Sequence, residues 1–229
     1  MMPLSQRIAL CGFLLIAPTF AITVDDFSTS QGPLVTTAGA VSGPGIIGGV
    51  REFLPGHSFE AAGGIGTFST PDGTGNVLVM GYDGVADLAT RSGTFAPVDL
   101  TDGGLADLFL LSVTVLSSPA SQPATVSLVL NLFDADGNSG STAPFFVTST
   151  GVASAALPTS GVDLTRITAL SVPIFMSVRT LGEFTLSVDY FCTGNSTGCT
   201  SAPATVPEPS AFVLFGLGLA ALTLRLRNR

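Results

Sequence analysis

Hydrophobic and polar residues alternate along much of this chain with a period of two. Between Thr125 and Phe133, apolar side chains at every second position are separated by residues such as Ser127 and Asn131. Between Glu183 and Tyr190, the apolar residues of one face alternate with polar residues. These apolar residues are Phe184, Leu186, Val188 and Tyr190. Because successive side chains of a strand point to opposite faces, both segments are predicted to be strands with one solvated face.

Shorter apolar stretches extend the pattern over the rest of the central region. Further strands are expected at residues 22–27, 46–54, 77–82, 108–116, 142–148 and 167–172, and a glycine-broken strand at 59–69. Turn signals at Pro71–Asn76 and Asp99–Gly104 lie between strands. No segment between residues 22 and 205 has a sustained period of 3.6. The chain is therefore predicted to be all-β, an antiparallel β-sandwich of jelly-roll type.

The first 21 residues have the features of an export signal. Arg7 precedes an apolar run at residues 8–17, and Thr19-Phe20-Ala21 places small residues at positions −3 and −1 of a cleavage site. This pattern predicts a signal helix that is removed after Ala21, so the body of the protein is expected outside the cytoplasm.

The C-terminal segment, residues 206–229, has three parts in a fixed order. It begins with Pro207-Glu208-Pro209, continues with an apolar run at residues 211–224 and ends with Arg225, Arg227 and Arg229. As a helix, the run would rise only about 21 Å, against a hydrocarbon core of about 30 Å. A short transmembrane helix with its arginine cluster in the cytoplasm is predicted, with the body on the other side.

This triplet, helix and arginine cluster resemble the PEP-CTERM sorting signal of exopolysaccharide-producing Gram-negative bacteria. The resemblance implies that exosortase, a membrane-embedded processing enzyme, recognises residues 207–209 and processes the protein near them. The alternative is an ordinary C-terminal anchor, which has the same topology and differs only in processing. On either interpretation, the inner membrane holds the precursor, and the resemblance implies a final position at the cell surface or beyond.

Four regions follow from these signals. They are a signal peptide at 1–21, a β-sandwich ectodomain at 22–192, a linker at 193–205 and the sorting segment at 206–229. Cys192 and Cys199 remain after Cys11 leaves with the signal. Only turn-compatible residues separate them, and an oxidising compartment favours a disulfide between them.

Charge excludes one class of partner. The body from residue 22 to residue 206 has fifteen acidic residues and four arginines, a formal charge of −11, and the chain has no lysine. A surface of this sign repels nucleic acid, so no nucleic-acid partner is expected.

Oxygen-bearing side chains at alternate positions form one candidate metal site. Asp134, Asp136 and Asn138 have the spacing of the first ligands of a calcium loop, but Phe145 stands where an EF-hand has its glutamate. The same Asp-Gly-Asn sequence, between two strands, favours a hairpin turn. Calcium is therefore a candidate cofactor beside the turn interpretation, and no other metal site is predicted.

The residues of common active sites are few. His57 is the only histidine, no Gly-x-Ser-x-Gly elbow is present, and most carboxylates lie in turns where turn propensity explains them. Sugar-binding sites usually use flat aromatic side chains, but the chain has no tryptophan and only two tyrosines. Tyr190 is expected on the apolar face of its strand, and the position of Tyr82 is not predicted. The protein is therefore predicted not to be an enzyme.

Three short segments carry a second resemblance. Val24–Ser28, Gly48–Glu52 and Val98–Asp107 are similar to segments of secreted bacterial domains built as galactose-binding-like jelly rolls. This resemblance implies a two-sheet body of about eight strands over residues 22–191.

The expected role is that of a non-enzymatic surface or extracellular-matrix protein, associated with exopolysaccharide and sorted through residues 207–209. A glycan- or calcium-binding module is the first alternative, and a secreted hydrolase is the second. A binding module should show an exposed aromatic residue or a concave polar patch on one sheet. A hydrolase should show two convergent carboxylates in a cleft.

Overall fold

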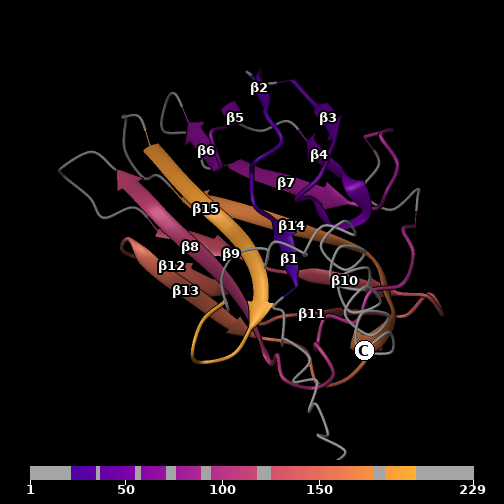
Figure 1. The fold of residues 1–229 in the computed structure, drawn as a ribbon. Helices are drawn as coiled ribbons and strands as arrows, with labels where there is room; N and C mark the ends of the chain where they lie inside the picture. The colour runs from indigo at the N-terminus through magenta and orange to yellow at the C-terminus, as the bar shows by residue number, and fades with distance from the viewer. Residues whose placement is uncertain are drawn as a thin grey trace, which may run out of the picture.

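The fold is an antiparallel sandwich of two β-sheets, as the alternating pattern predicts (Figure 1). The computed structural model describes residues 22–34, 37–54, 58–70, 76–88, 94–117, 125–177 and 184–199. The signal peptide, His57, the sorting triplet and the arginine cluster lie outside these residues. Within them there are fifteen strands and two short 3₁₀ turns, Ile47–Gly49 and Leu164–Arg166. No helix in this part of the chain has the length and apolarity to cross a membrane.

The first sheet has seven strands in the order β13-β8-β15-β6-β5-β2, with β1 beside β15. Their bounds are β1 Thr23–Asp25, β2 Gln31–Leu34, β5 Ser58–Ala62, β6 Ile65–Thr70, β8 Leu108–Ser117, β13 Gly151–Ala156 and β15 Phe184–Gly194. The long strand β15 lies in the middle and pairs with β8, β6 and β1. The last described strand of the chain therefore holds this sheet together.

The second sheet has eight strands in the order β11-β10-β14-β7-β4-β3, with β9 and β12 attached beyond β14. Their bounds are β3 Gly39–Ser42, β4 Val50–Leu54, β7 Asn76–Tyr82, β9 Thr125–Leu128, β10 Asn131–Asp134, β11 Ser139–Ser141, β12 Phe145–Val147 and β14 Ile167–Ser177. One edge of β14 pairs first with β10 and then with β9, while its other edge pairs with β7.

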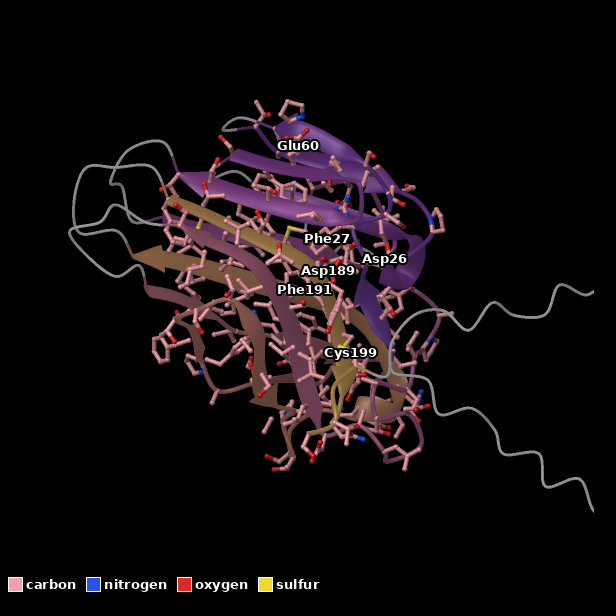
Figure 2. All side chains as sticks on the ribbon, turned by 60° about the vertical axis from the view of Figure 1, so that its left-hand side comes forward. Asp26, Phe27, Glu60, Asp189, Phe191 and Cys199 are labelled. Carbon is pink, nitrogen blue, oxygen red and sulfur yellow. A yellow bond between two sulfur atoms is a disulfide. The ribbon has the colours of Figure 1, made fainter. Side chains whose placement is uncertain are left out.

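The core lies between the sheets and is rich in phenylalanine. Phe27 and Phe191 are fully buried, with ring centroids 5.4 Å apart, and both lie inside the sandwich (Figure 2). Phe59 is stacked on Phe53 at 4.9 Å and lies 5.0 Å from Phe68. Each of these rings comes from an inward-facing strand or loop position, so burial of these large rings drives the two sheets together.

The structure has more and shorter strands than the eight that the jelly-roll resemblance implied. The expected broken strand at 59–69 is the hairpin β5–β6, because Gly63 and Gly64 adopt φ values of 62° and 82° and reverse the chain. The expected strand at 125–133 is divided into β9 and β10, which pair with successive parts of β14. Strands β2 and β3 lie in the glycine-rich stretch before residue 50, where no strand was expected.

A β-bulge changes the faces of β15. The register against β8 shifts between Val188 and Tyr190, so the alternation of the first half of the strand is reversed after Asp189. Phe191 is fully buried and Tyr190 is only half-buried. The prediction that Tyr190 lies on the apolar face was wrong, because sequence alternation does not show an inserted residue.

Strand β15 continues to Gly194, two residues into the range assigned to the linker. Thr193 is fully buried, and an isolated bridge joins Asn195 to Gly198. Because β1 pairs antiparallel with β15, Thr23 lies opposite Cys192. The first and last strands of the described body therefore meet at one place.

Candidate functional site

The Asp134 turn joins β10 to β11, and its carboxylate accepts hydrogen bonds on both oxygens. Oδ1 accepts the backbone N–H groups of Asp136 and Asn138 at 2.9 and 2.8 Å. Oδ2 accepts the Asn138 side-chain amide at 3.0 Å and the backbone N–H of Asp163 at 2.9 Å. These donors, above all the Asp163 N–H, lower the pKa of Asp134 to about 2. A cation would have to displace N–H donors here, so the geometry favours the hairpin-turn interpretation over calcium.

The residue Asp136 of the same turn also has a partner. Its Oδ2 accepts a hydrogen bond from Nη1 of Arg166 at 3.0 Å, in a pair that is about half exposed. The three residues named as candidate calcium ligands are thus brought together, but their hydrogen bonds are those of a closed turn.

Cys192 and Cys199 form a disulfide, with Cα atoms 6.3 Å apart. Their loop is further closed by Asn195, whose side-chain oxygen accepts hydrogen bonds from the N–H and the hydroxyl of Thr197. The Asn195 amide nitrogen donates to the Leu105 carbonyl at 3.3 Å. The disulfide loop is therefore attached to the body just before β8, and its contacts are structural ones.

The two tyrosines do not form an aromatic platform. Tyr82 is fully buried and donates its hydroxyl hydrogen to Asp25 at 2.9 Å, and Tyr190 is half-buried. The exposed aromatic residues of the described chain are two phenylalanines, Phe146 on β12 and Phe175 on β14, with 62% and 40% of their surface exposed.

Phe146 and Phe175 lie in one row across the outer face of the eight-stranded sheet. Phe146 is the register partner of Ser127 on β9, and Ser127 is in turn the partner of Phe175. Phe175 is also opposite Val77 on β7, which is 44% exposed. Directly paired residues share a face, so all four side chains point outward. Two strand spacings, about 10 Å, separate the two phenylalanines.

A second row of half-buried apolar side chains runs beside this one. It comprises Leu54, Val79, Pro173 and Val129, on β4, β7, β14 and the β9–β10 connection. We refer to the eight residues of the two rows as the apolar outer face. None of them is charged, although the body as a whole is strongly acidic.

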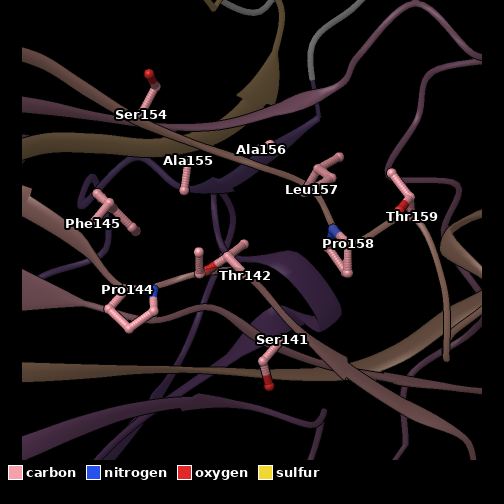
Figure 3. Close-up of a pocket in the computed structure, with 11 residues that line it drawn as sticks. Ser141, Thr142, Pro144, Phe145, Ser154, Ala155, Ala156, Leu157, Pro158 and Thr159 are labelled. Carbon is pink, nitrogen blue, oxygen red and sulfur yellow. The ribbon is translucent and has the colours of Figure 1, made fainter.

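A groove of about 470 Å³ lies at the adjacent seam between the two sheets (Figure 3). One wall is formed by residues 141–145 and the other by residues 154–159. Hydroxyl groups and apolar rings line it, and no charged residue does. Phe145, one of the lining residues, packs edge-on against Phe109, with ring centroids 6.1 Å apart. Neighbouring residues Phe145 and Phe146 thus face the groove and the apolar outer face, respectively.

Carboxylates converge at a different place, near the end of β7. Oxygen atoms of Glu52, Asp83 and Asp87 lie within 4.8 Å of one another. Glu52 and Asp83 are fully buried, whereas Asp87 is exposed. The groove of Figure 3 has no carboxylate in its lining, so the groove and the carboxylate cluster are separate features.

Sequence reasoning missed the exposed phenylalanines, although a signal for them exists. In Phe145-Phe146-Val147 and Ile174-Phe175-Met176, three consecutive apolar residues occur in a strand. Since successive side chains alternate between faces, the central residue must point away from the core. An uninterrupted apolar triplet in an otherwise alternating strand therefore indicates an apolar position on the outer face.

Comparison with known proteins identifies the C-terminal segment. Residues 205–228 match the family model described as the PEP-CTERM protein-sorting motif. The match covers the triplet, the apolar run and all but the last of the arginines predicted to be cytoplasmic. It supports the resemblance drawn from these residues. A search of curated proteins found no match.

Solved structures similar to the body share little sequence with it. An agarase, AgWH50C, matches 77% of this chain with 12% identity and a TM-score of 0.41, and the protein PfGH50B matches 72% with 10% identity and a TM-score of 0.36. This chain spans only about a quarter of each, 25% and 27%. The family 11 carbohydrate-binding module of the cellulosomal cellulase Lic26A-Cel5E of Clostridium thermocellum matches 76% of this chain and is itself covered to 95%, with 14% identity and a TM-score of 0.35.

Proposed function

We propose that this chain, which carries a PEP-CTERM sorting motif, is a non-enzymatic protein of the cell surface or extracellular matrix. The match at residues 205–228 is the observation that carries the proposal. In this proposal the signal peptide directs export, and the C-terminal helix holds the precursor in the inner membrane. An exosortase then recognises Pro207-Glu208-Pro209 and releases the body outside.

The arrangement of the body is compatible with this route. Its first strand, β1, lies against the end of β15, so the residues that follow the signal peptide and those that precede the sorting motif leave the sandwich at the same place. The Cys192–Cys199 disulfide closes the chain at this point. A body attached in this way presents the rest of its surface to the medium, and a disulfide suits an oxidising compartment.

Intact mass spectrometry of the native protein from membrane and extracellular fractions tests the sorting proposal. We expect an extracellular species that runs from near Ile22 to within a few residues of Glu208. Replacement of Pro207, Glu208 and Pro209 by alanine should leave the uncleaved chain in the membrane. Pro203→Ala, a proline change outside the triplet, should be processed normally. A native species that ends at Arg229 and occurs only in membranes would contradict the proposal of exosortase processing. The remaining interpretation would then be an ectodomain held by an ordinary C-terminal anchor.

The apolar outer face favours a second function, the binding of a neutral polysaccharide. Sugar rings present C–H faces that pack on flat aromatic side chains, and binding sites combine such rings with a few polar groups. Phe146 and Phe175 supply two rings about 10 Å apart, and the hydroxyl-lined groove lies beside them. The acidic body disfavours an anionic polysaccharide, so a neutral one is the expected ligand.

Affinity electrophoresis of the full chain in gels that contain a neutral polysaccharide tests this function. The wild type should be retarded in the gel. The Phe146→Ala/Phe175→Ala double variant should bind the polysaccharide at least about tenfold more weakly and therefore migrate with little or no retardation. Val115→Ala is the matched control, because Val115 is 44% exposed on the other sheet. Equal retardation of the double variant and the wild type, with unchanged melting temperatures, would refute this binding surface.

A further inference from the structure

Strand β13 lies at one margin of the seven-stranded sheet, beside β12 of the other sheet (Figure 1). It pairs with β8 in unbroken antiparallel register over all six residues, from Gly151 opposite Val113 to Ala156 opposite Leu108. In the part of the chain that the structure describes, no second strand pairs with it. Because the backbone groups of an antiparallel strand point to both sides, β13 presents a row of N–H and C=O groups away from β8.

The other strands with a single partner are protected against further pairing, and β13 is not. Strands β1, β2, β3, β11 and β12 have only three or four residues each. In addition, β1 contains the charged Asp25, and β2 contains Pro33, which has no N–H to donate. Strand β13 has no proline, no charged side chain and no bulge. Proteins use these devices to prevent contact between sheet edges, so a longer edge without them points to a partner strand.

The side chains of β13 leave its free edge accessible. Val152, Ser154 and Ala156 are exposed on the outer face of the sheet, and Ala153 and Ala155 face the core. Figure 3 shows Ser154 and Ala155 pointing to opposite sides of the strand. None of the six side chains is larger than valine. A second backbone can therefore approach β13 at the ordinary strand spacing of about 4.8 Å.

The distribution of charge indicates which partner this edge fits. The body has a formal charge of −11, so two copies repel each other over most of their surface. Between residues 108 and 162, which include β8 to β13, only Asp134 and Asp136 are charged, and Asp136 is paired with Arg166. Two copies of the chain can therefore approach each other at this margin with the least repulsion. A basic partner would gain no attraction from an edge that has no acidic group.

We propose that two copies of this chain pair antiparallel through their β13 strands, which joins their seven-stranded sheets into one. A two-fold axis brings the same surface of each copy together. Directly opposed side chains share a face, so the axis must pass beside a residue, either Ala153 or Ser154 at the middle of the strand. Val152 then lies opposite Ser154 or Ala156 of the second copy, respectively. The pairing depends neither on the sorting motif nor on polysaccharide binding.

Disulfide trapping with single cysteines in the full exported chain tests the pairing. A residue beside the two-fold axis lies opposite its own copy, with Cα atoms about 4.5–5.5 Å apart, which a disulfide can bridge. Either Ala153→Cys or Ser154→Cys should therefore give a covalent dimer on non-reducing gels, and the better of the two identifies the axis. Val152→Cys and Ala156→Cys should give at least about tenfold less, because these positions lie beyond disulfide reach of their own copies.

Ile65→Cys is the matched control for random collision. Ile65 is 38% exposed and lies on β6, which is separated from β13 by two strands of the same sheet. This variant should remain monomeric. The proposal is overturned if neither Ala153→Cys nor Ser154→Cys forms a dimer, or if Ile65→Cys forms as much. A monomeric result is expected if residues outside the described part of the chain cover β13 instead.

A second measurement separates this edge from other contacts, such as one between C-terminal segments. Sedimentation of the full wild-type chain in detergent should show a dimer that dissociates on dilution. In the Val152→Lys/Ser154→Lys variant, either position of the axis places two lysines directly opposite each other, so the dimer should dissociate at least about tenfold more readily. Ile65→Lys should sediment as the wild type does. A wild type that is monomeric at every concentration, or a dimer unaffected by the two lysines, would overturn the proposal.

Discussion

Arg51 binds Asp25 in an ion pair that is completely inaccessible to solvent. Nη1 of Arg51 lies 2.9 and 3.0 Å from the two carboxylate oxygens, and both side chains have no exposed surface. Nε of Arg51 donates to the Gln31 side chain, and Nη2 donates to the Thr29 carbonyl. The guanidinium group also lies 5.3 Å from the centre of the Phe27 ring. The pair joins β1 to β4, and so joins one sheet to the other.

Removal of Arg51 should destabilise the protein strongly, because it leaves the Asp25 carboxylate buried without its partner. We expect Arg51→Met to lower the free energy of unfolding by about 3–5 kcal/mol. The double variant Arg51→Met/Asp25→Asn should recover part of this loss, since no isolated charge remains. Denaturant unfolding of the four proteins of the cycle measures both effects.

The exposed pair of Arg166 and Asp136 is the control for this cycle. Its side chains are 49% and 58% exposed, so Arg166→Met should change stability by no more than about 1 kcal/mol. If Arg51→Met and Arg166→Met lowered the free energy of unfolding by similar amounts, burial of the Arg51–Asp25 pair would have no energetic consequence.

Stability should fall in acid in a way that depends on Asp134. Its pKa in the folded protein is about 2, below the ordinary value of 3.8. A lowered pKa means that the ionised form stabilises the fold at pH values above 3.8, and that this contribution is lost as the pH falls from about 4 to 2. We expect the stability difference between the wild type and Asp134→Asn to shrink over this range. Chemical unfolding at several pH values from 2 to 6 measures it, and a constant difference would contradict the prediction.

The bulge in β15 predicts opposite sensitivities for two adjacent aromatic residues. Phe191→Ala should cost about 3–5 kcal/mol, because its ring is fully buried against Phe27 and Phe109. Tyr190→Ala should cost clearly less, because Tyr190 is half-buried. Thermal unfolding of both variants compares them. A larger loss of stability for Tyr190→Ala than for Phe191→Ala would indicate that Tyr190 is the residue packed inside the sandwich, and it would contradict the bulge.

Loss of the disulfide should have a moderate effect, because the loop between Cys192 and Cys199 is short. A sequence separation of seven residues corresponds to roughly 2–3 kcal/mol of stabilisation in the chain-entropy account. The Cys192→Ala/Cys199→Ala variant should lose about this amount. Dithiothreitol should lower the melting temperature of the wild type and leave that of the double variant unchanged.

Periodicity predicted the strands with strong apolar alternation and missed those without it. Strands β7, β8 and β15 were expected close to their true positions, because burial of one face determines their sequence pattern. Strands β2, β3 and β11 are only three or four residues long, each contains a glycine and none shows apolar alternation, so pairing with neighbouring strands stabilises them. Such pairing depends on the tertiary structure, so local sequence gives no signal for it.

The candidate sites show the same division. The hairpin at Asp134 was predictable, because all the residues of the turn are close in the sequence. The cluster of Glu52 with Asp83 was not, since 31 positions separate them and only the register of β4 on β7 brings them together. The meeting of Asp25 with Arg51 was equally hidden, although each lies in a segment that resembles secreted jelly-roll domains.

The central position of β15 has a consequence for the order in which the protein is made. A chain exported from its N-terminus delivers β6, β8 and β1 long before the strand that must lie between and beside them. Their open edges cannot be paired natively until residues 184–194 have crossed the membrane. Only about a dozen residues then separate the end of this strand from the sorting triplet. A membrane stop at the C-terminus would therefore hold the chain in place while its sandwich closes, and release would follow completion of the fold.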